Sequence, residues 1–499
     1  CRRKFLRAHQ NTRDVQQQLL ERLVEAHAGT GFGKDHNLLS VKTMDDFRKA
    51  VPLSTYDYYR PYIDRVREGD FKALMPNGVP PLMFSMTSGT TGTPKYIPVT
   101  QPFADQMKMG WNAFGIGVIR DHMSAFGRSI LSLTSTMHEE TSPAGIPCGA
   151  ISGLLAQNQQ RLVRRMYPTP QWVSEIPEIQ TRFYTILRYA IERNVAFITT
   201  ANPSTTIQLI EAARDQIEPL LSDLENGTFT PPGDLPKTLA HQVRAFRANP
   251  RRADMIRDRI DESGTFTARC LWDLSFVANW TGGTLGLYLP KLRKLTGGAP
   301  IRDIGLLASE GRFNLPIRDN TSAGVAEILS NVLEFIPVEQ REKDNPETLL
   351  AHELEVGHEY FLVFSNFTSL MRYDIDDRIR VVDFYGQSPV FEFLSRGKHT
   401  ANITGEKLTE HQVVTAMECT SRDLQLHVDQ FYLQGHFADT PYYELHVDSP
   451  IAATTLSRCF DHHLRLINME YNSKRKTDRL GRASDCHSSG YHAILHDHP

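Results

Sequence analysis

Apolar residues recur every three or four positions in several parts of the chain, which is the spacing of a helix with one buried face. The first such stretch covers residues 12–27, and the glycines of the segment GTGFGKDHN end it. Further helices are predicted at 103–114, at 177–192 and at 236–262, the last one broken near Pro250. Apolar positions of the first helix are Val15, Leu19, Leu20, Leu23 and Val24.

Short apolar or β-branched runs lie between these helices, at 129–133 and 195–199, and are typical of buried strands. Alternation of strands with helices predicts an α/β core. After about residue 330 the pattern changes to successive strands without intervening helices, which predicts an antiparallel sheet or a barrel-like subdomain. These strands are expected at 332–338, 359–365, 377–383 and 390–395.

A domain boundary is predicted near Arg396, where the polar, glycine-bearing segment SRGKHTANITGEKLTEHQV begins. A helix, strands at 424–433 and 442–448, and a last helix at 452–471 follow it, which predicts a small α+β module. The expected fold is therefore mixed α/β, with a large domain at 1–395 and a small one at 396–499.

The charge balance and the chain's length narrow the class of protein. With 499 residues the chain is too long for a single minimal module. It contains 55 Lys and Arg residues and 58 Asp and Glu residues. The chain has no excess of positive charge that would attract nucleic acid, so small-molecule partners are expected. No apolar run reaches the roughly 18 residues of a membrane-spanning helix. Oligomeric state is not readable from the sequence.

The six cysteines are far apart and none forms a CxxC pair, so the sequence indicates neither a zinc site nor a disulfide framework. A reducing cytoplasm is the expected compartment. The chain begins at Cys1 without an apolar segment after it, which we interpret as a start that lacks upstream residues; a mature lipoprotein cysteine is the alternative. Four histidines in the tail HSSGYHAILHDHP lack a second ligand cluster, so a solvated terminus is favoured over a metal site.

The segment SMTSGTTGTPKYIPVT, within 85–100, carries the clearest chemical signal. Between Thr87 and Lys95 it holds five hydroxyl residues, two glycines and one lysine. Glycines let backbone N–H groups approach a phosphate, hydroxyls add donors and the lysine adds a positive charge. A polyphosphate-binding loop is therefore predicted, with the interior candidates Ser88, Gly89, Thr90, Thr91 and Gly92.

This loop is not a Walker A motif, because Gly89 and Gly92 are too close together and Tyr96 follows the lysine. A Ser/Thr/Gly surface turn is the alternative interpretation. TSGTTGTPK resembles the phosphate signature of the adenylate-forming superfamily, which includes acyl-CoA synthetases, luciferases and peptide-synthetase adenylation domains.

Within that superfamily the chain is most similar to the auxin-responsive (Gretchen Hagen) acyl acid amido synthetases, including their bacterial relatives. FGKDHN and VPLSTYDYYRPYIDRVREGD resemble the segments before the family's phosphate loop (85–98 here). GLLASEGRFNLP matches its adenine-side motif (305–311), SLMRYDIDDRIRV its ribose motif (372–378), and ANITGEKLTE its hinge and C-terminal lysine. The similarity spans nearly the whole chain.

The resemblance implies that Ala308 and Ser309 lie against the adenine and that Glu310 binds Mg²⁺. Small side chains leave room for a flat base, and a carboxylate is a hard oxygen ligand suited to Mg²⁺. A carboxylate at the start of a helix is the alternative interpretation of Glu310.

Asp377 matches the family aspartate that accepts hydrogen bonds from the ribose hydroxyls, a role for an ionised acceptor. The sequence departs from the family pattern here, since Asp376 stands where glycine is usual and Asp374 where arginine is usual. The assignment could therefore shift by one residue, and Arg372 or Arg378 could supply the missing arginine. An acidic, solvated strand edge is the alternative.

Lys407 aligns with the superfamily lysine that reaches the α-phosphate and the acyl oxygen, where it would stabilise developing charge. A solvated surface lysine is the alternative. Arg396 lies at the expected hinge (396–407), where rotation of the small domain would separate adenylation from transfer. Segments 198–211 and 280–290 carry small and aromatic residues near predicted strand ends, where α/β enzymes hold ligands, and are expected at the acyl pocket.

The resemblance implies a ligase that uses ATP and Mg²⁺ to convert a carboxylic acid into acyl-AMP and then transfers the acyl group to an amino acid. An acyl-CoA ligase uses the same first step and is one alternative. A degenerate nucleotide-binding protein is the alternative from another class, because of the replacements at Asp374 and Asp376.

Overall fold

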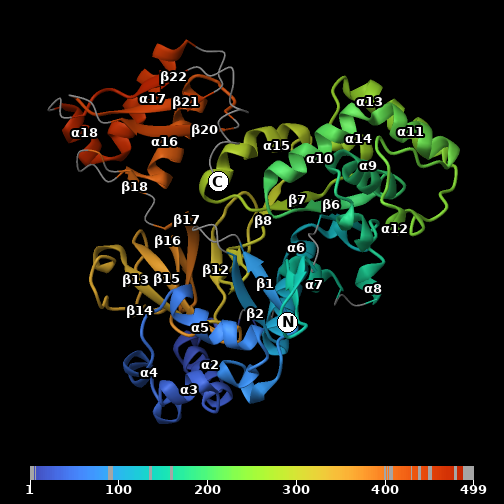
Figure 1. The fold of residues 1–499 in the computed structure, drawn as a ribbon. Coiled ribbons are helices and arrows are strands. Elements are labelled where there is room, and N and C mark those ends of the chain that lie inside the picture. Colours follow the sequence, from blue (N-terminus) through green and yellow to red (C-terminus); the bar gives the residue numbers. More distant parts are fainter. Residues whose placement is uncertain are drawn as a thin grey trace. The chain divides into compact units, whose positions relative to one another are not determined.

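The computed structural model describes residues 5, 7–87, 94–133, 138–157, 161–397, 400–401, 403, 408–428, 430–436, 440–447, 452–476 and 480–486 (Figure 1). The chain forms two compact units, which are described separately. The first unit contains Cys1–Thr281, Leu292–Ile375 and Ile379–Glu392, and the second contains Gly282–Lys291, Asp376–Arg378 and Phe393–Pro499.

Helix α2, Thr12–His27, begins the first unit and agrees with the predicted helix. Its apolar stripe is buried, and Gln16 joins it to the sheet by donating to the carbonyls of Ile328 and Asn331, each at 2.8 Å. A Cβ at Gly33 would come within 2.0 Å of the His27 carbonyl oxygen, so glycine is needed where α3 meets the end of α2. The other helices of this layer are α3 (Gly31–Asp35), α4 (Met44–Ala50) and α5 (Tyr56–Arg67).

A four-stranded sheet of order β2-β1-β5-β4 follows. Its strands are β1 (Met83–Thr87), β2 (Lys95–Val99), β4 (Glu140–Thr141) and β5 (Pro147–Gly149). Helix α6, Gln101–Asp121, begins after β2 and is longer at both ends than the predicted helix. Thr100 accounts for its start, because the side chain accepts a hydrogen bond from the backbone N–H of Phe103.

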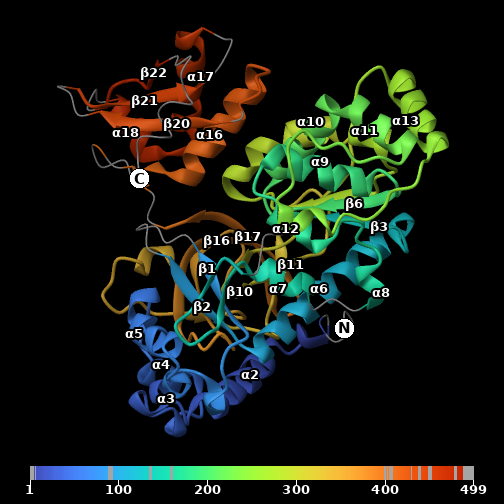
Figure 2. The same ribbon diagram turned by 45° about the vertical axis from the view of Figure 1, so that its right-hand side comes forward.

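A parallel sheet of order β3-β6-β7-β8 forms the α/β core that the sequence predicts. Figure 2 shows helices α9, α10 and α11 on one side of this sheet and α6 on the other. The strands are β3 (Ser129–Ser132), β6 (Val195–Thr199), β7 (Phe276–Asn279) and β8 (Ile301–Asp303). The helices between them are α7 (Ile151–Gln157), α8 (Arg161–Arg164), α9 (Ile179–Ala190), α10 (Pro203–Asp215), α11 (Ile217–Asn226), α12 (Lys237–Ala240), α13 (Pro250–Ser263), α14 (Ala268–Leu271) and α15 (Leu289–Leu295).

A seven-stranded sheet of order β11-β12-β17-β16-β15-β13-β14 completes the first unit and agrees with the run of strands expected after residue 330. Strand β13 pairs antiparallel with β15 over its whole length, from Val332 opposite Ser365 to Pro337 opposite Tyr360. The strands are β11 (Asn314–Pro316), β12 (Gly324–Ala326), β13 (Val332–Pro337), β14 (Leu349–Leu350), β15 (Glu359–Ser365), β16 (Tyr373–Tyr385) and β17 (Ser388–Arg396).

The second unit is an α+β module, as predicted, with a sheet of order β20-β21-β22 and a hydrophobic core. Its helices are α16 (Glu410–Asp423), α17 (Ala453–Ile467) and α18 (Met469–Lys476). Its strands are β18 (Thr400–Ala401), β19 (Leu408–Thr409), β20 (Phe431–His436), β21 (Tyr442–Val447) and β22 (Ser484–Cys486).

Two sequence predictions for this unit were wrong in detail. The strand expected over 424–433 begins only at Phe431, because Leu424 ends helix α16 and Gln425 takes a positive φ of 51°. The single last helix is two helices that meet at Asn468. Among the described residues of both units, no helix has the length and apolarity needed to cross a membrane.

Candidate functional site

The predicted phosphate loop connects two antiparallel strands. Strand β1 ends at Thr87 and β2 begins at Lys95, and these two residues face each other across the ladder. The loop candidates between them, Ser88, Gly89, Thr90, Thr91 and Gly92, lie outside the described residues. The candidate loop therefore connects the two strands of a hairpin. The pairing of Thr87 with Lys95 fixes the backbone at both ends of the loop.

Lys95 and its neighbour Tyr96 are positioned by helix α5. The Lys95 ammonium lies 5.7 Å from the centre of the Tyr56 ring, and the Tyr56 hydroxyl accepts a hydrogen bond of 2.9 Å from the Tyr96 backbone N–H. Arg67, at the end of the same helix, lies 3.7 Å from the centre of the Tyr96 ring. Two cationic side chains therefore lie beside the first residues of β2.

The adenine-side motif forms a tight β-turn. Ala308, at the end of β9 (Leu307–Ala308), pairs with Gly311, at the start of β10 (Gly311–Arg312), so Ser309 and Glu310 are the two turn residues. Glu310 is buried, while Ala308 and Ser309 are half-buried. The alternative of a helix-start carboxylate is wrong, because Glu310 lies between two strands.

Asn366, which directly follows β15, holds this turn in place. Its side-chain amide donates to the backbone carbonyl of Glu310 at 2.8 Å and to the side-chain oxygen of Asn331 at 2.9 Å. Asn331 donates in turn to the carbonyl of Arg312 at 2.7 Å. Two buried asparagines thus fix both sides of the turn that carries Glu310.

The turn and the β1–β2 hairpin lie next to each other. Leu307 of β9 packs against a cluster that contains Met83 of β1 and Val99 of β2. Phe367 packs against the same cluster, and its carbonyl accepts a 2.6 Å hydrogen bond from the Thr100 hydroxyl. The fold therefore packs the strand that precedes Glu310 against the β1–β2 hairpin, at the end of the hairpin opposite the predicted phosphate loop.

Asp377 and Arg396, both in the second unit, form an ion pair. The Arg396 guanidinium donates to both carboxylate oxygens of Asp377, at 2.6 and 3.2 Å. Asp377 is fully buried, whereas 52% of the Arg396 side chain is exposed. The alternative of a solvated acidic edge is therefore wrong for Asp377.

The residues around Asp377 clarify how this chain departs from the family pattern. Asp376 has a φ of 64°, the left-handed conformation that glycine adopts most easily, and its carbonyl accepts from the backbone N–H of Gly397 at 2.7 Å. Asp374 pairs with Arg341, and Arg372 is buried against Glu334 at 2.9 Å. Arg372 therefore has a structural partner already.

Lys407 lies outside the described residues, as do Lys398, Gly405 and Glu406. The described segments around them are two short strands, β18 and β19, which pair antiparallel. Leu408, directly after Lys407, is buried in the core of the second unit.

The carboxyl edge of the parallel sheet carries buried polar groups, where α/β folds bind ligands. Asn279, at the end of β7, donates to the hydroxyls of Thr200 and Thr206 at 2.6 and 3.1 Å. Its side-chain oxygen has no partner among the described residues. Trp280 follows and donates to the Gly305 carbonyl at 2.9 Å. The beginnings of both segments expected at the acyl pocket therefore meet at this edge.

Two buried charges lie near the same edge. Asp303, at the end of β8, accepts 2.6 Å hydrogen bonds from Thr281 and from the Gly305 N–H, yet burial raises the pKa of Asp303 to about 6. Arg312 donates to the Ile304 carbonyl at 2.8 Å and lies 4.4 Å from the centre of the Trp111 ring. Burial lowers the pKa of Arg312 to about 10, so it stays charged at neutral pH.

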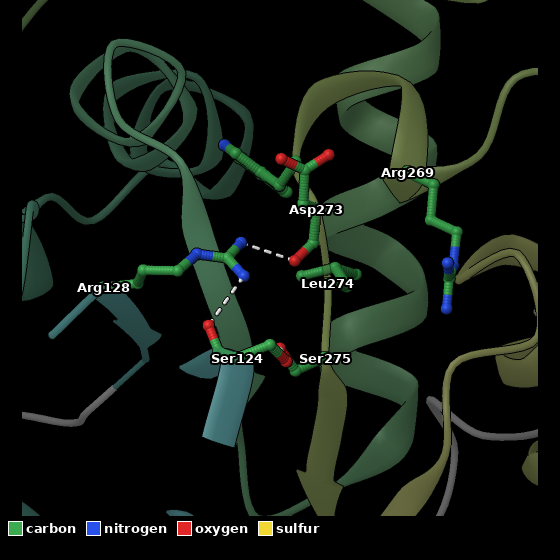
Figure 3. A pocket seen from close by; sticks show the side chains of 7 residues that line it. Ser124, Arg128, Arg269, Asp273, Leu274 and Ser275 are labelled. Carbon is green, nitrogen blue, oxygen red and sulfur yellow. Dashed lines mark hydrogen bonds between the residues drawn. The ribbon is translucent and has the colours of Figure 1, made fainter. Parts of the chain in front are cut away.

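A hollow of about 260 Å³ lies at the opposite, amino edge of the same sheet (Figure 3). It lies beside Arg128, which precedes β3, and Ser275, which precedes β7. The Arg128 guanidinium donates to the backbone carbonyls of Ser124 and Asp273. These bonds give Arg128 a structural role, and none of the predicted site residues lines this hollow.

The sequence patterns did not indicate a role for Asn279, Asp303, Arg312 or Asn366. A partial signal was present, because Asn279 and Asn366 are the polar residues that close or directly follow apolar strand runs. Their partners are distant in sequence: Asn366 and Glu310 are 56 positions apart, and Asn279 and Thr200 are 79 apart. Only the folded chain shows which groups they hold.

Comparison with protein families matches most of the chain. The GH3 family N-terminal domain matches residues 1–301, and the GH3 family central domain matches residues 329–396.

Relatives of known name are similar over most of their length. The jasmonoyl–L-amino acid synthetase JAR4 of Nicotiana attenuata is 22% identical, and the match covers 82% of this chain and 74% of that protein. The indole-3-acetic acid-amido synthetase GH3.10 of Arabidopsis thaliana is 25% identical, and the match covers 87% of this chain and 81% of that protein.

Solved structures share the fold. A GH3.15 acyl acid amido synthetase superimposes with a TM-score of 0.82 at 19% identity, over 97% of this chain and 88% of that one. AtGH3.15 in complex with 2,4-DB superimposes with a TM-score of 0.85, also at 19% identity, over 99% of this chain and 90% of that one. The mixed α/β fold expected from the sequence is thereby confirmed.

Proposed function

Because this chain belongs to the GH3 family, as its motifs predicted, we propose that it is an acid–amino acid ligase. It activates a carboxylic acid with ATP and transfers the acyl group to the amine of an amino acid. The observation that carries this proposal is the match of the family's N-terminal domain to residues 1–301, which include the phosphate-loop signature. Because the cysteines whose side chains the structure describes are free thiols, as is typical of a reducing compartment, we propose that the reaction takes place in the cytoplasm.

The phosphates of ATP bind at the loop between β1 and β2. Thr87, Ser88, Gly89, Thr90, Thr91 and Gly92 supply hydroxyl and backbone donors, and Lys95 supplies positive charge. The aligned ends of the two strands support this assignment, because a hairpin holds both ends of the loop at a fixed separation.

The adenine lies against Ala308 and Ser309, whose small side chains leave a flat surface at the β9–β10 turn. Glu310 holds Mg²⁺, for which its carboxylate is a suitable ligand, and the buried turn that carries it packs beside the β1–β2 hairpin. When bound, Mg²⁺ neutralises phosphate charge and so favours attack on phosphorus.

Asp377 binds the ribose hydroxyls, and the two hydrogen bonds from Arg396 orient its buried carboxylate. An ionised carboxylate has enough lone pairs to accept the Arg396 bonds and those of the ribose together. We propose that residues 396–499 form a domain that moves about a hinge at 396–407 between the two half-reactions.

The reaction proceeds in two steps. A carboxylate oxygen of the acid attacks the α-phosphorus of ATP, the bond to the β-phosphate oxygen breaks, and pyrophosphate leaves. The amine nitrogen of the amino acid then attacks the activated carbonyl, AMP leaves with the bonding electron pair, and the nitrogen loses a proton. Lys407 stabilises the negative charge that develops during the first step.

The acid binds at the carboxyl edge of the parallel sheet. The Trp280 indole and the buried polar groups of Asn279, Thr200 and Thr206 lie there, an arrangement typical of small-molecule sites in α/β proteins.

ATP–pyrophosphate exchange tests this proposal directly. The full chain is incubated with MgATP, labelled pyrophosphate and a panel of aromatic and aliphatic acids. Each acid is tested alone, with mixed amino acids and with CoA, and acyl products are identified by mass spectrometry. Acid-dependent exchange together with an amide product supports the ligase; a thioester formed only with CoA, or no exchange with any acid, contradicts it.

Lys407→Ala separates chemistry from nucleotide binding. We expect exchange to fall by roughly a hundredfold, because a charge that stabilises the transition state is lost, while ATP affinity stays nearly unchanged. ATP affinity is measured by calorimetry on the same preparation. Exchange at the wild-type rate would remove Lys407 from the mechanism.

A further inference from the structure

Three side chains with metal-binding atoms meet in the second unit, and none of them is among the residues assigned above. They are Asp423, the last residue of α16, and Cys459 and His463 on α17. Their ligand atoms all lie within 4.8 Å of one another, and the His463 Nε2 lies 2.9 Å from a carboxylate oxygen of Asp423. The three groups are therefore already gathered around one point.

Helix geometry explains why these residues converge. Cys459 and His463 are four positions apart, so their side chains lie on the same face of α17. Cys419 and Asp423 have the same spacing on α16. The two helices share the hydrophobic core of the second unit. The gathered residues come from two neighbouring helices rather than from a CxxC motif, which is why the cysteine spacing alone gave no signal.

We propose that Asp423, Cys459 and His463 bind a divalent d-block cation of the zinc type. Sulfur, imidazole nitrogen and carboxylate oxygen are the ligand types that such ions take in tetrahedral sites. A water molecule or the Cys419 thiolate supplies the fourth ligand. Binding replaces the proton of the Cys459 thiol with the metal ion, and that proton passes to solvent.

The exposure of Asp423 suits entry of an ion from solvent. The Asp423 side chain is 54% exposed, whereas only 13% of the His463 side chain is exposed. An ion from solvent can therefore reach the Asp423 carboxylate first. The neighbouring side chains restrict the orientation of the His463 imidazole, because it is mostly buried. An exposed His–Asp pair by itself contributes little to stability, and it does not explain why a thiol lies at the same point.

The site differs in chemistry from the proposed Mg²⁺ site. Mg²⁺ prefers oxygen ligands, whereas a thiolate favours softer ions. A bound ion would join the end of α16 to the middle of α17 and so stabilise the second unit. This inference does not depend on the proposed ligase activity.

Cobalt titration of the full chain tests the site. The reduced protein is freed of metal with a chelator and titrated with Co²⁺ in the absence of nucleotide. We expect saturation at one equivalent, with a thiolate-to-cobalt charge-transfer band and the intense visible bands of tetrahedral Co²⁺. Zn²⁺ should abolish both signals. Only the weak spectrum of octahedral Co²⁺, or no saturable signal, would overturn the proposal.

Substitutions assign the ligands. Cys459→Ser should abolish the charge-transfer band, and His463→Ala should weaken cobalt binding by at least tenfold. His462→Ala and Cys270→Ser are matched controls that should leave the titration unchanged. A fifth variant, in which glutamine replaces the histidines of the tail, should also retain the band. A charge-transfer band that persists in Cys459→Ser would contradict the assignment.

Thermal unfolding gives a second measurement that does not depend on spectra. Zn²⁺ should raise the Tm of the wild-type protein and of His462→Ala, because a ligand that binds only the folded state stabilises it. It should not raise the Tm of Cys459→Ser or of His463→Ala. Equal shifts in all four proteins would place zinc binding elsewhere.

Discussion

Asp377 is a carboxylate that the fold buries completely, and Arg396 provides the opposite charge beside it. Burial of an unpaired charge is strongly unfavourable, so the two hydrogen bonds from Arg396 are needed for the native state. Asp376, directly before it, has a positive φ instead, a conformation that costs an ordinary residue roughly 1 kcal/mol. Two neighbouring aspartates thus have different constraints.

The first prediction concerns this pair of neighbours. Asp377→Asn should raise the KM for ATP by about tenfold or more, because charge-assisted hydrogen bonds to the ribose are lost. Asp376→Gly should keep wild-type kinetics and raise the Tm slightly, because glycine adopts the observed φ without strain. Pyrophosphate exchange at varied ATP concentration measures both. The reverse result, with Asp376→Gly impaired and Asp377→Asn active, would show that the ribose ligand is shifted by one residue.

The second prediction concerns Glu310, whose buried turn is held by Asn366. Glu310→Gln keeps the size of the side chain but removes the charge that binds Mg²⁺. We expect kcat for exchange to fall by roughly a hundredfold and the Mg²⁺ concentration at half-maximal rate to rise. Glu339→Gln, at an exposed position, is the matched control. An unchanged dependence on Mg²⁺ would assign the metal to another residue.

At the scale of elements, the segment between β15 and β16 connects the parts of the first unit that carry the site. Asn366 holds the turn of Glu310, and the Phe367 carbonyl binds Thr100 at the start of α6. Arg372, at the end of the segment, donates to the buried Glu334 of β13 at 2.9 and 3.2 Å. Burial acts to raise the pKa of Glu334, but Arg372, Thr348 and Arg48 outweigh it and hold the pKa below its ordinary value.

The third prediction tests this ion pair. Glu334→Gln should lower the free energy of unfolding by about 3 to 5 kcal/mol, because it leaves the buried Arg372 guanidinium without its counter-ion. Asp57→Asn, which removes an exposed pair with Arg60, should change it by less than about 1 kcal/mol. Denaturant unfolding of the full chain measures both. Equal effects of the two substitutions would show that the buried pair does not stabilise the segment.

The sequence pattern predicted elements best where one face of the element is buried. Helix α2 and strand β15 have the predicted bounds, since a regular apolar pattern was sufficient to define them. The pattern failed at the end of α16, where Leu424, Leu426 and Val428 alternate like a strand. There the chain turns through a positive φ at Gln425, and the local pattern contains no signal of this turn.

The candidate site was predictable only in part. Motif resemblance predicted Glu310, Asp377 and Arg396, and the structure pairs the last two. The groups that hold these residues, such as Asn366, were not predictable because their partners lie far away in the sequence. Roles in binding and catalysis remain predictions for all site residues, including Lys407.

At the scale of the whole first unit, two buried histidines connect the N-terminal part of the chain to strand β17 and to the segment between β15 and β16. His9 Nδ1 lies 2.8 Å from the Ser388 hydroxyl of β17. His27, at the end of α2, lies 2.9 Å from the Ser369 hydroxyl and 2.7 Å from the Leu23 carbonyl. Burial lowers the pKa of each histidine from 6.5 to about 4. Both are therefore neutral in the folded protein at neutral pH.

The fourth prediction follows from these two pKa values. A histidine with a lowered pKa in the folded state stabilises the fold fully above about pH 6.5, and this stabilisation is lost as the pH falls towards about 4. Below pH 6.5 the unfolded chain takes up protons that the folded chain does not. Each histidine should therefore contribute a loss of about 3 kcal/mol over this range.

Denaturant unfolding between neutral pH and pH 4, followed by tryptophan fluorescence, measures this dependence. All four tryptophans, Trp111, Trp172, Trp272 and Trp280, belong to the first unit, so the signal reports on the unit that contains both histidines. Asp303, whose pKa is raised to about 6, has the opposite effect and offsets part of the decline. His27→Gln removes one titrating histidine and should make the decline smaller by about 3 kcal/mol than in the wild-type protein. His358→Gln, whose side chain is 62% exposed, should leave the slope unchanged. If the free energy of unfolding of His27→Gln fell with pH as steeply as that of the wild-type protein, groups other than His27 would cause the sensitivity to acid.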